Sequence, residues 1–145
     1  MVEHASEKEN SKLAEKVADK IMNGTSAEAA ESLSQALLPM NHDGYNEFLQ
    51  SVKGMTVPGH GKNILELDQK NNLARIWSRS DLQSDYLIVT PGQNLTKICK
   101  FDLSQQDEKV TQKAVNSCID TYAKVNKLED PNLIIAGKTL VIPYL

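Results

Sequence analysis

Apolar residues recur every three or four positions in the first part of the chain, which is the spacing of a buried helix face. A first helix is predicted from Ser11 to the Asn23-Gly24 pair, because glycine ends a helix at little conformational cost. Its apolar face consists of Leu13, Val17 and Ile21. Residues 1–10 are charged and carry no such pattern, so we expect a disordered lead-in there.

Two more amphipathic helices follow. Thr25 or Ser26 is a good N-cap for the second helix, and Pro39 stops it. The third helix begins after a short polar turn and ends near Gly54. Its apolar face consists of Tyr45, Phe48, Leu49 and Val52.

A β-hairpin is predicted after these helices. Residues 64–68 and 73–77 have strand composition, and the polar residues 69–72 form the turn between them. A lone hairpin is barely stable in water, so we expect it to pack on the helices. The expected contacts are Leu65, Leu67, Leu73 and Ile76.

The small polar residues after the hairpin predict a domain boundary. Residues 81–84 are the expected linker. They separate a helical domain with a β-hairpin, residues 11–80, from a second domain at 85–145. Nothing in the first domain indicates a functional site.

The second domain is predicted to run strand, helix, helix, strand. Residues 86–89 form a strand, and 90–93 form a tight turn in which proline fixes its own φ and glycine accepts a positive φ. Asn94 is a good N-cap for the next helix. A further helix is expected over 110–126, and a last strand at 140–142. The whole chain is therefore expected to be α+β.

Two segments of this domain resemble the LysM family, over residues 85–143. The opening is Tyr86-Leu-Ile-Val-Thr-Pro-Gly-Gln-Asn-Leu-Thr-Lys-Ile-Cys99. The closing half is Tyr122-Ala-Lys-Val-Asn-Lys-Leu-Glu-Asp-Pro-Asn-Leu-Ile-Ile-Ala-Gly-Lys-Thr-Leu-Val-Ile-Pro143. The resemblance implies a βααβ fold with both helices on one face of a two-stranded sheet.

The chain departs from the family's pattern in three places. Gln93 and Asn94 stand where Asp-Thr usually follows the turn glycine, which removes a charge and keeps a capping side chain. About a dozen extra residues lie within 101–117, between the two helices. Cys99 occupies a core position that is often alanine in the family.

The resemblance also implies a shallow glycan-binding groove with two walls. Carried over position by position, one wall includes Gly92, Gln93, Asn94 and Leu95. The other includes Asp130, Pro131, Asn132, Leu133 and Ile134. The implied ligand is peptidoglycan or another N-acetylglucosamine oligomer. Leu95 is also expected in the core, and Ile134 and Ile135 cannot both face one side of an extended loop.

Composition and charge exclude several other functions. The formal net charge is −3 with 16 basic and 19 acidic residues, so no basic patch for nucleic acid is expected. No apolar run approaches the roughly 20 residues of a membrane span, and no signal peptide is visible. We expect a bacterial protein of the cell envelope, periplasm or exterior if a signal peptide has been removed. A cytoplasmic location stays open.

The two cysteines allow two interpretations. A disulfide between Cys99 and Cys118 would close a loop of about 20 residues, and buried free thiols are the alternative. No metal site or cofactor is expected, because the three histidines lie far away in sequence. Glu66 and Asp68 share one strand face, but a short hairpin is a poor place for a glycosidase active site.

The sequence thus predicts a non-enzymatic protein that uses a LysM module to bind cell-wall glycan. A different class is the main alternative: a protein–protein assembly module in which LysM is a structural platform and binds no sugar. In either case the N-terminal domain can contact another protein. A third alternative is a fragment of a larger enzyme.

Overall fold

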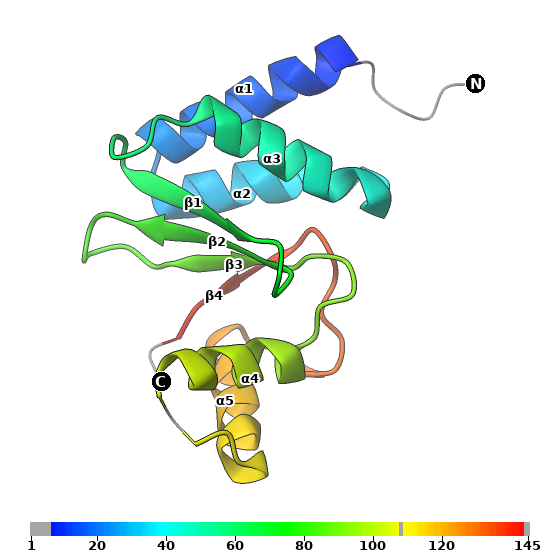
Figure 1. Ribbon diagram of the computed structural model, residues 1–145, viewed down its shortest axis with the longest axis vertical. Helices are drawn as coiled ribbons and strands as arrows, with labels where there is room; N and C mark the ends of the chain where they lie inside the picture. Colours follow the sequence, from blue (N-terminus) through cyan, green and yellow to red (C-terminus); the bar gives the residue numbers. More distant parts are fainter. Residues whose placement is uncertain (1–6, 108, 144–145) are drawn as a thin grey trace.

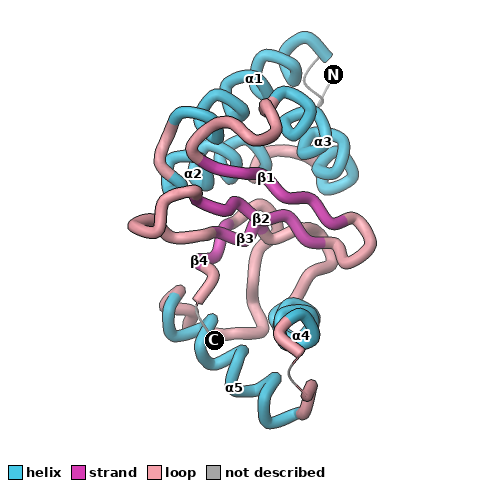
Figure 2. The backbone as a smooth tube through the Cα atoms, turned by 60° about the vertical axis from the view of Figure 1, so that its left-hand side comes forward, coloured by secondary structure: helices cyan, strands magenta, loops and turns pink. Residues whose placement is uncertain are grey.

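The computed structural model describes residues 7–107 and 109–143, and the fold is α+β. Within this part of the chain, helices lie on both faces of one four-stranded antiparallel sheet (Figures 1 and 2). The helices are α1 (Glu7–Asn23), α2 (Ser26–Leu37), the short 3₁₀ helix η1 (His42–Gly44), α3 (Tyr45–Met55), α4 (Leu95–Gln105) and α5 (Gln112–Val125). The strands are β1 (Asn63–Asp68), β2 (Leu73–Ser78), β3 (Tyr86–Ile88) and β4 (Thr139–Val141).

The first two helices begin for different reasons. α1 begins at Glu7 rather than Ser11, so the expected disorder is wrong for residues 7–10, and residues 1–6 lie outside the described part. Glu and Lys are good helix formers, so a helix can extend past its apolar face. α2 begins after Thr25, whose hydroxyl accepts from the Glu28 N–H while the Glu28 carboxylate accepts from the Thr25 N–H. This capping box confirms the predicted N-cap.

One sheet joins the two halves of the chain. Its order is β1-β2-β3-β4, and the pairing of β2 with β3 puts Ala74 opposite Ile88. The expected linker, 81–84, therefore lies in a loop between adjacent strands of one sheet. The loop is held in place, because the Asp85 carboxylate accepts from the Ser78 N–H at 2.7 Å and Gln83 accepts from the Ser26 N–H at 2.8 Å.

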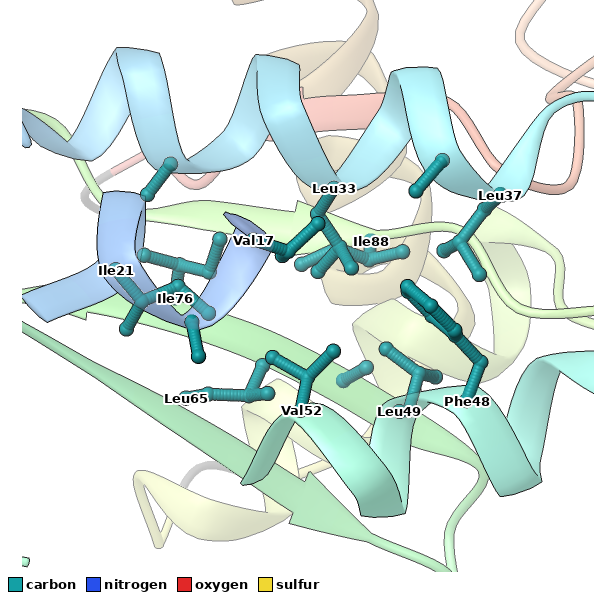
Figure 3. Packing of buried hydrophobic residues seen from close by; sticks show 14 of the residues in the cluster. Val17, Ile21, Leu33, Leu37, Phe48, Leu49, Val52, Leu65, Ile76 and Ile88 are labelled. Atoms are coloured by element: carbon teal, nitrogen blue, oxygen red, sulfur yellow. The ribbon is translucent and has the colours of Figure 1, made fainter. Parts of the chain in front are cut away.

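The strands bury alternate residues on opposite faces, and two separate cores result. The face toward α1–α3 holds a core that includes Leu65, Ile76 and Ile88 (Figure 3). The face toward α4 and α5 holds a second core that includes Leu87. The prediction that Leu73 packs on the first helices is wrong, since Leu73 belongs to this second core. It stands one residue from Ala74, which faces the first core, and neighbouring strand residues point to opposite faces.

Candidate functional site

The candidate site lies where two loops leave the β3–β4 pair. β3 pairs antiparallel with β4, and α4 and α5 connect them, as expected for a βααβ unit. The pairing continues past both strands: the Val89 N–H donates to the Lys138 carbonyl, and the Gly137 N–H donates to the Val89 carbonyl, both at 2.8 Å. The start of the β3–α4 turn therefore lies beside the end of the α5–β4 loop (Figure 1).

The β3–α4 turn is shaped by its own backbone and by the helix that follows it. The Gln93 N–H donates to the Thr90 carbonyl at 3.1 Å, and Gly92 has a φ of +84°, a value that favours glycine. The Asn94 side chain accepts from the Lys97 N–H at 2.8 Å and caps α4. Gly92 and Asn94 are both exposed, so this end of α4 presents backbone and a polar side chain to solvent.

Two residues expected in the first wall point inward instead. The Gln93 side chain is only 9% exposed and donates to the Asn72 carbonyl at 2.6 Å, so it fastens the turn to the β1–β2 hairpin. Leu95 is 2% exposed and belongs to the second core. Neither side chain can contact a ligand in this arrangement, and only their backbone can contribute to the wall.

The α5–β4 loop is folded around an acidic side chain, Asp130. The Asp130 carboxylate accepts from the Asn132 N–H at 2.9 Å, and the Asp130 carbonyl accepts from the Leu133 N–H at 3.0 Å. This turn lifts Leu133 into solvent, where its side chain is 70% exposed. Ile135 is 59% exposed. Ile134 between them is half-buried against the second core, so the two isoleucines do face different sides.

A small pocket of about 240 Å³ lies beside this loop. Its lining includes Leu133, Ile134 and Ile135 of the loop, Leu140 of β4, and Val89, which directly follows β3. Of the expected site residues, this pocket brings together Leu133 and Ile134. Gly92, Gln93, Asn94 and Leu95 are not among its lining residues. Pro131 is half-buried, and Asp130 and Asn132 are exposed on the same loop.

Asn126 holds the second loop in place, a role that its place in the sequence motif did not reveal. Its side-chain oxygen accepts from the Val141 N–H at 2.7 Å, and its amide nitrogen donates to the Val141 carbonyl at 3.0 Å. The side chain thus satisfies the outer edge of β4 as a neighbouring strand would. The signal available in the sequence was an asparagine directly after the second helix of the LysM-like segment.

The helical half covers the base of the two loops and leaves their tips exposed. The Tyr45 hydroxyl donates to the Ala136 carbonyl at 3.4 Å. At Gly137, a Cβ would lie 2.7 Å from the Tyr45 hydroxyl oxygen and 3.1 Å from a Leu38 methyl group. The Asn72 amide donates to the Pro91 carbonyl at 3.0 Å. These contacts fix the roots of both loops against α2, α3 and the hairpin.

The inserted stretch within 101–117 lies at the other end of α4 from the turn (Figure 1). It lengthens α4 to Gln105 and leads into α5 at Gln112. A disulfide between Cys99 and Cys118 joins the two helices, so the disulfide interpretation of the cysteines holds in this structure. The bond lies within the second core, because both cysteines are buried.

A charged cluster links the hairpin to α4 and α5 on the same side of the sheet. The Arg75 guanidinium donates to the Glu66 carboxylate at 2.8 Å and lies 5.2 Å from the Phe101 ring centre. The Tyr122 hydroxyl donates to the Asp102 carboxylate at 2.8 Å, and Arg75 lies 3.9 Å from that carboxylate. Burial raises the pKa of Asp102 despite both partners.

The same cluster includes the Glu66 carboxylate, one of the two carboxylates considered for acid–base chemistry. Glu66 accepts from Arg75 and, at 3.1 Å, from the Trp77 indole N–H. The Asp68 carboxylate accepts from the Asn71 backbone and side chain. Both carboxylates are therefore explained by local structure. The described residues contain no group of three or more His, Cys, Asp or Glu residues that could hold a metal ion.

The chain was compared with protein-family models, curated proteins and solved structures. None of them matches it. The LysM resemblance therefore stays a resemblance of sequence order, and a function has to be argued from the site. Over 7–107 and 109–143, no helix has both the length and the apolar character that crossing a membrane requires.

Proposed function

We propose that the chain binds a polymer containing N-acetylglucosamine, such as peptidoglycan, and so anchors the protein at a bacterial cell wall. The observation that supports this proposal is a coincidence of two independent features. The LysM-like sequence order falls on a β3–α4–α5–β4 unit, and its two predicted loops have roots that lie side by side and tips that are exposed. The binding is non-enzymatic in this proposal.

The chemistry of the loops suits an acetylated amino sugar. Such a sugar presents an acetamido methyl group, an amide N–H and C=O, and ring hydroxyls. Gly92 is exposed, and nothing lies within 4 Å of the place where a Cβ would be, so a sugar ring can approach its backbone. Leu133 and Ile135 border the 240 Å³ pocket and offer an apolar seat for the methyl group.

One such module binds a short oligomer weakly, because few contacts must offset the ordering of ligand and loops. A polymer with repeated sugars, or several copies of the protein on one strand, raises the effective affinity. The buried disulfide supports an oxidising compartment such as the periplasm or the exterior. Cell-wall glycan is found in the same compartments.

Sedimentation with insoluble peptidoglycan tests the proposal. We expect the protein to sediment with the polymer, and Leu133→Ser to weaken binding about fivefold, which corresponds to losing about 1 kcal/mol of apolar contact. Leu82→Ser is the matched control, because Leu82 is 96% exposed and lies on the β2–β3 loop, outside the two glycan loops. Absence of sedimentation, or equal loss in both variants, would contradict glycan binding at these loops.

The alternative of an assembly module has one feature in its favour. Leu133 and Ile135 are large apolar side chains on one exposed loop, and such side chains also suit a protein partner. That function predicts no binding of peptidoglycan by the wild-type protein. It also predicts that Leu133→Ser changes the sedimentation coefficient of an assembly rather than the amount bound to glycan.

A further inference from the structure

A second and larger pocket, of about 460 Å³, adjoins the proposed glycan loops. It lies between η1 and α3 on one side and the β1–β2 hairpin turn and the β3–α4 turn on the other. Its floor is apolar and includes Leu49, Leu67 and Ala74. Its rim carries polar side chains from three separate segments, including Asp43, Asn46 and Asp68. A pocket with this lining can hold an aliphatic group that ends in a polar one.

The pocket is continuous with the roots of both glycan loops. Pro91, in the turn that precedes α4, lines the pocket directly. Tyr45 also lines it and donates a hydrogen bond to Ala136, at the end of the α5–β4 loop. Asn72, a third lining residue, binds the Pro91 carbonyl. A ligand that leaves the glycan loops on the α3 side therefore meets this pocket next.

The charge of the pocket favours a cationic group. Two aspartates, Asp43 and Asp68, and one histidine, His42, are among its lining residues, and no Lys or Arg is. Hydrogen bonds from the Asn71 side chain and backbone lower the pKa of Asp68, so its carboxyl group is ionised at neutral pH. The nearest cations in sequence are the exposed Lys70, which follows Gln69, and Arg75, which follows Ala74 and is paired with Glu66. An ammonium group on an aliphatic chain complements both the rim and the floor.

We propose that this pocket receives the amine-bearing peptide attached to the glycan, such as the lysine or diaminopimelate side chain of a peptidoglycan stem. The inference rests on the proposed glycan binding by the two loops. It gives the helical half a role in the same site, as the part that reads the peptide next to the sugar. Asn46 and Gln69, joined at 3.4 Å on the rim, offer amide groups to the peptide backbone.

The competing occupant is a further sugar ring of the same glycan strand. A sugar ring carries no positive charge, so its hydroxyl groups can donate hydrogen bonds to the two aspartates but form no ion pair with them. Its binding would also not depend on a free amine. These differences allow the two occupants to be separated with matched ligands.

The experiment is a calorimetric titration of the full chain with three ligands. The first is an N-acetylglucosamine tetramer without peptide. The second is a tetrasaccharide muropeptide whose stem ends in lysine amide. The third is the same muropeptide with the lysine amine acetylated. We expect the free-amine muropeptide to bind about fivefold tighter than its acetylated form, which is the effect of one charge pair near a surface.

A matched pair of variants places the effect in this pocket. Asp43→Asn is expected to remove most of the advantage of the free amine and to leave binding of the tetramer unchanged. Glu47→Gln removes the same charge a short distance along the same helical region, outside the lining of this pocket, and is expected to keep the advantage. Asn46→Lys adds a cation at the rim and removes an amide assigned to the peptide backbone, so it is expected to weaken both muropeptides and to weaken the free-amine form more.

The outcomes separate this inference from the proposed function. Equal affinities for the two muropeptides, with the tetramer still bound, would overturn the peptide pocket and leave glycan binding in place. An equal loss in Asp43→Asn and Glu47→Gln would also overturn it, because long-range charge would then explain the preference. If no ligand binds, both the proposed function and this inference fall.

Discussion

At the candidate site, asparagine and glutamine side chains form hydrogen bonds with backbone groups that have no partner in a neighbouring strand. Asn126 satisfies the outer edge of β4, and Gln93 binds the hairpin turn at the Asn72 carbonyl. Gln93 shows why sequence reasoning failed at this scale. A polar residue beside a turn glycine looks available to a ligand, but whether its amide is consumed depends on Asn72, which is remote in sequence. The cap at Asn94 was predictable because its partner is three residues away.

Asn126→Ala is expected to lower the free energy of unfolding by about 2 kcal/mol. The substitution removes the two hydrogen bonds between the Asn126 side chain and the Val141 backbone, each worth about 1 kcal/mol. Urea denaturation followed by circular dichroism measures the effect. Asn116→Ala, on the exposed surface of α5, is the control and should change stability by less than about 0.5 kcal/mol. Equal effects of the two substitutions would refute the role of Asn126.

At the scale of elements, a disulfide, a hydrogen bond and ion pairs add to the apolar packing that holds α4 and α5 to the sheet and to each other. The disulfide joins the two helices. The hydrogen bond from the Tyr122 hydroxyl to the Asp102 carboxylate joins them a second time. Arg75 connects this pair to the hairpin. The helices could be predicted from their caps and periodicity, but this charged cluster could not, because its members come from four elements, β1, β2, α4 and α5.

Reduction of the disulfide is expected to destabilise the protein by about 3 kcal/mol. The bond closes a loop with a sequence separation of 19, and the chain-entropy estimate gives about that value. Urea denaturation with and without a reducing agent measures the difference, and Cys99→Ala with Cys118→Ala serves as a reductant-independent check. If oxidised and reduced protein unfold at the same urea concentration, the link between α4 and α5 contributes nothing to stability.

Asp102→Asn is expected to raise stability at neutral pH, by under about 1 kcal/mol since the Arg75 ion pair offsets part of the burial cost. The folded pKa of Asp102 lies above its unfolded value, so the unfolded chain ionises first as pH rises. The wild type should therefore lose stability relative to the variant from about pH 4 upward, and the two should converge below that pH. Urea midpoints at pH 3.5 and pH 7 measure this. A variant advantage that is larger at the lower pH would contradict the sign.

At the scale of the whole molecule, the sheet unites halves that look separate in the sequence. The helices, the hairpin and the strand–helix–helix–strand order were predictable from periodicity, caps and turns. The pairing of β2 with β3 was not, because strands as short as β3 carry little pattern and the pairing is non-local. The polar loop before β3 has the composition of a linker. Its side chains are nevertheless fixed, because Gln83 and Asp85 accept from the backbone N–H groups of Ser26 and Ser78, and composition does not reveal such contacts.

A truncated chain of residues 85–145 is expected to be unstable. Ile88 is fully buried against α1–α3 in the intact protein, and removing residues 1–84 exposes it together with one edge of β3. We expect broad amide resonances, or aggregation, under conditions in which the full chain is folded. A dispersed spectrum that matches the corresponding resonances of the full chain would show that the C-terminal half folds independently.

The most direct measurement of the central claim is a titration of the isotope-labelled full chain with an N-acetylglucosamine tetramer, followed by amide chemical shifts. Glycan binding predicts shifts concentrated at Gly92, Asn94 and residues 130–135, with little change on the β2–β3 loop around Leu82. Saturating tetramer without shifts at those positions, or with shifts confined to α1 and the β2–β3 loop, would contradict the assignment of the two loops as a glycan site.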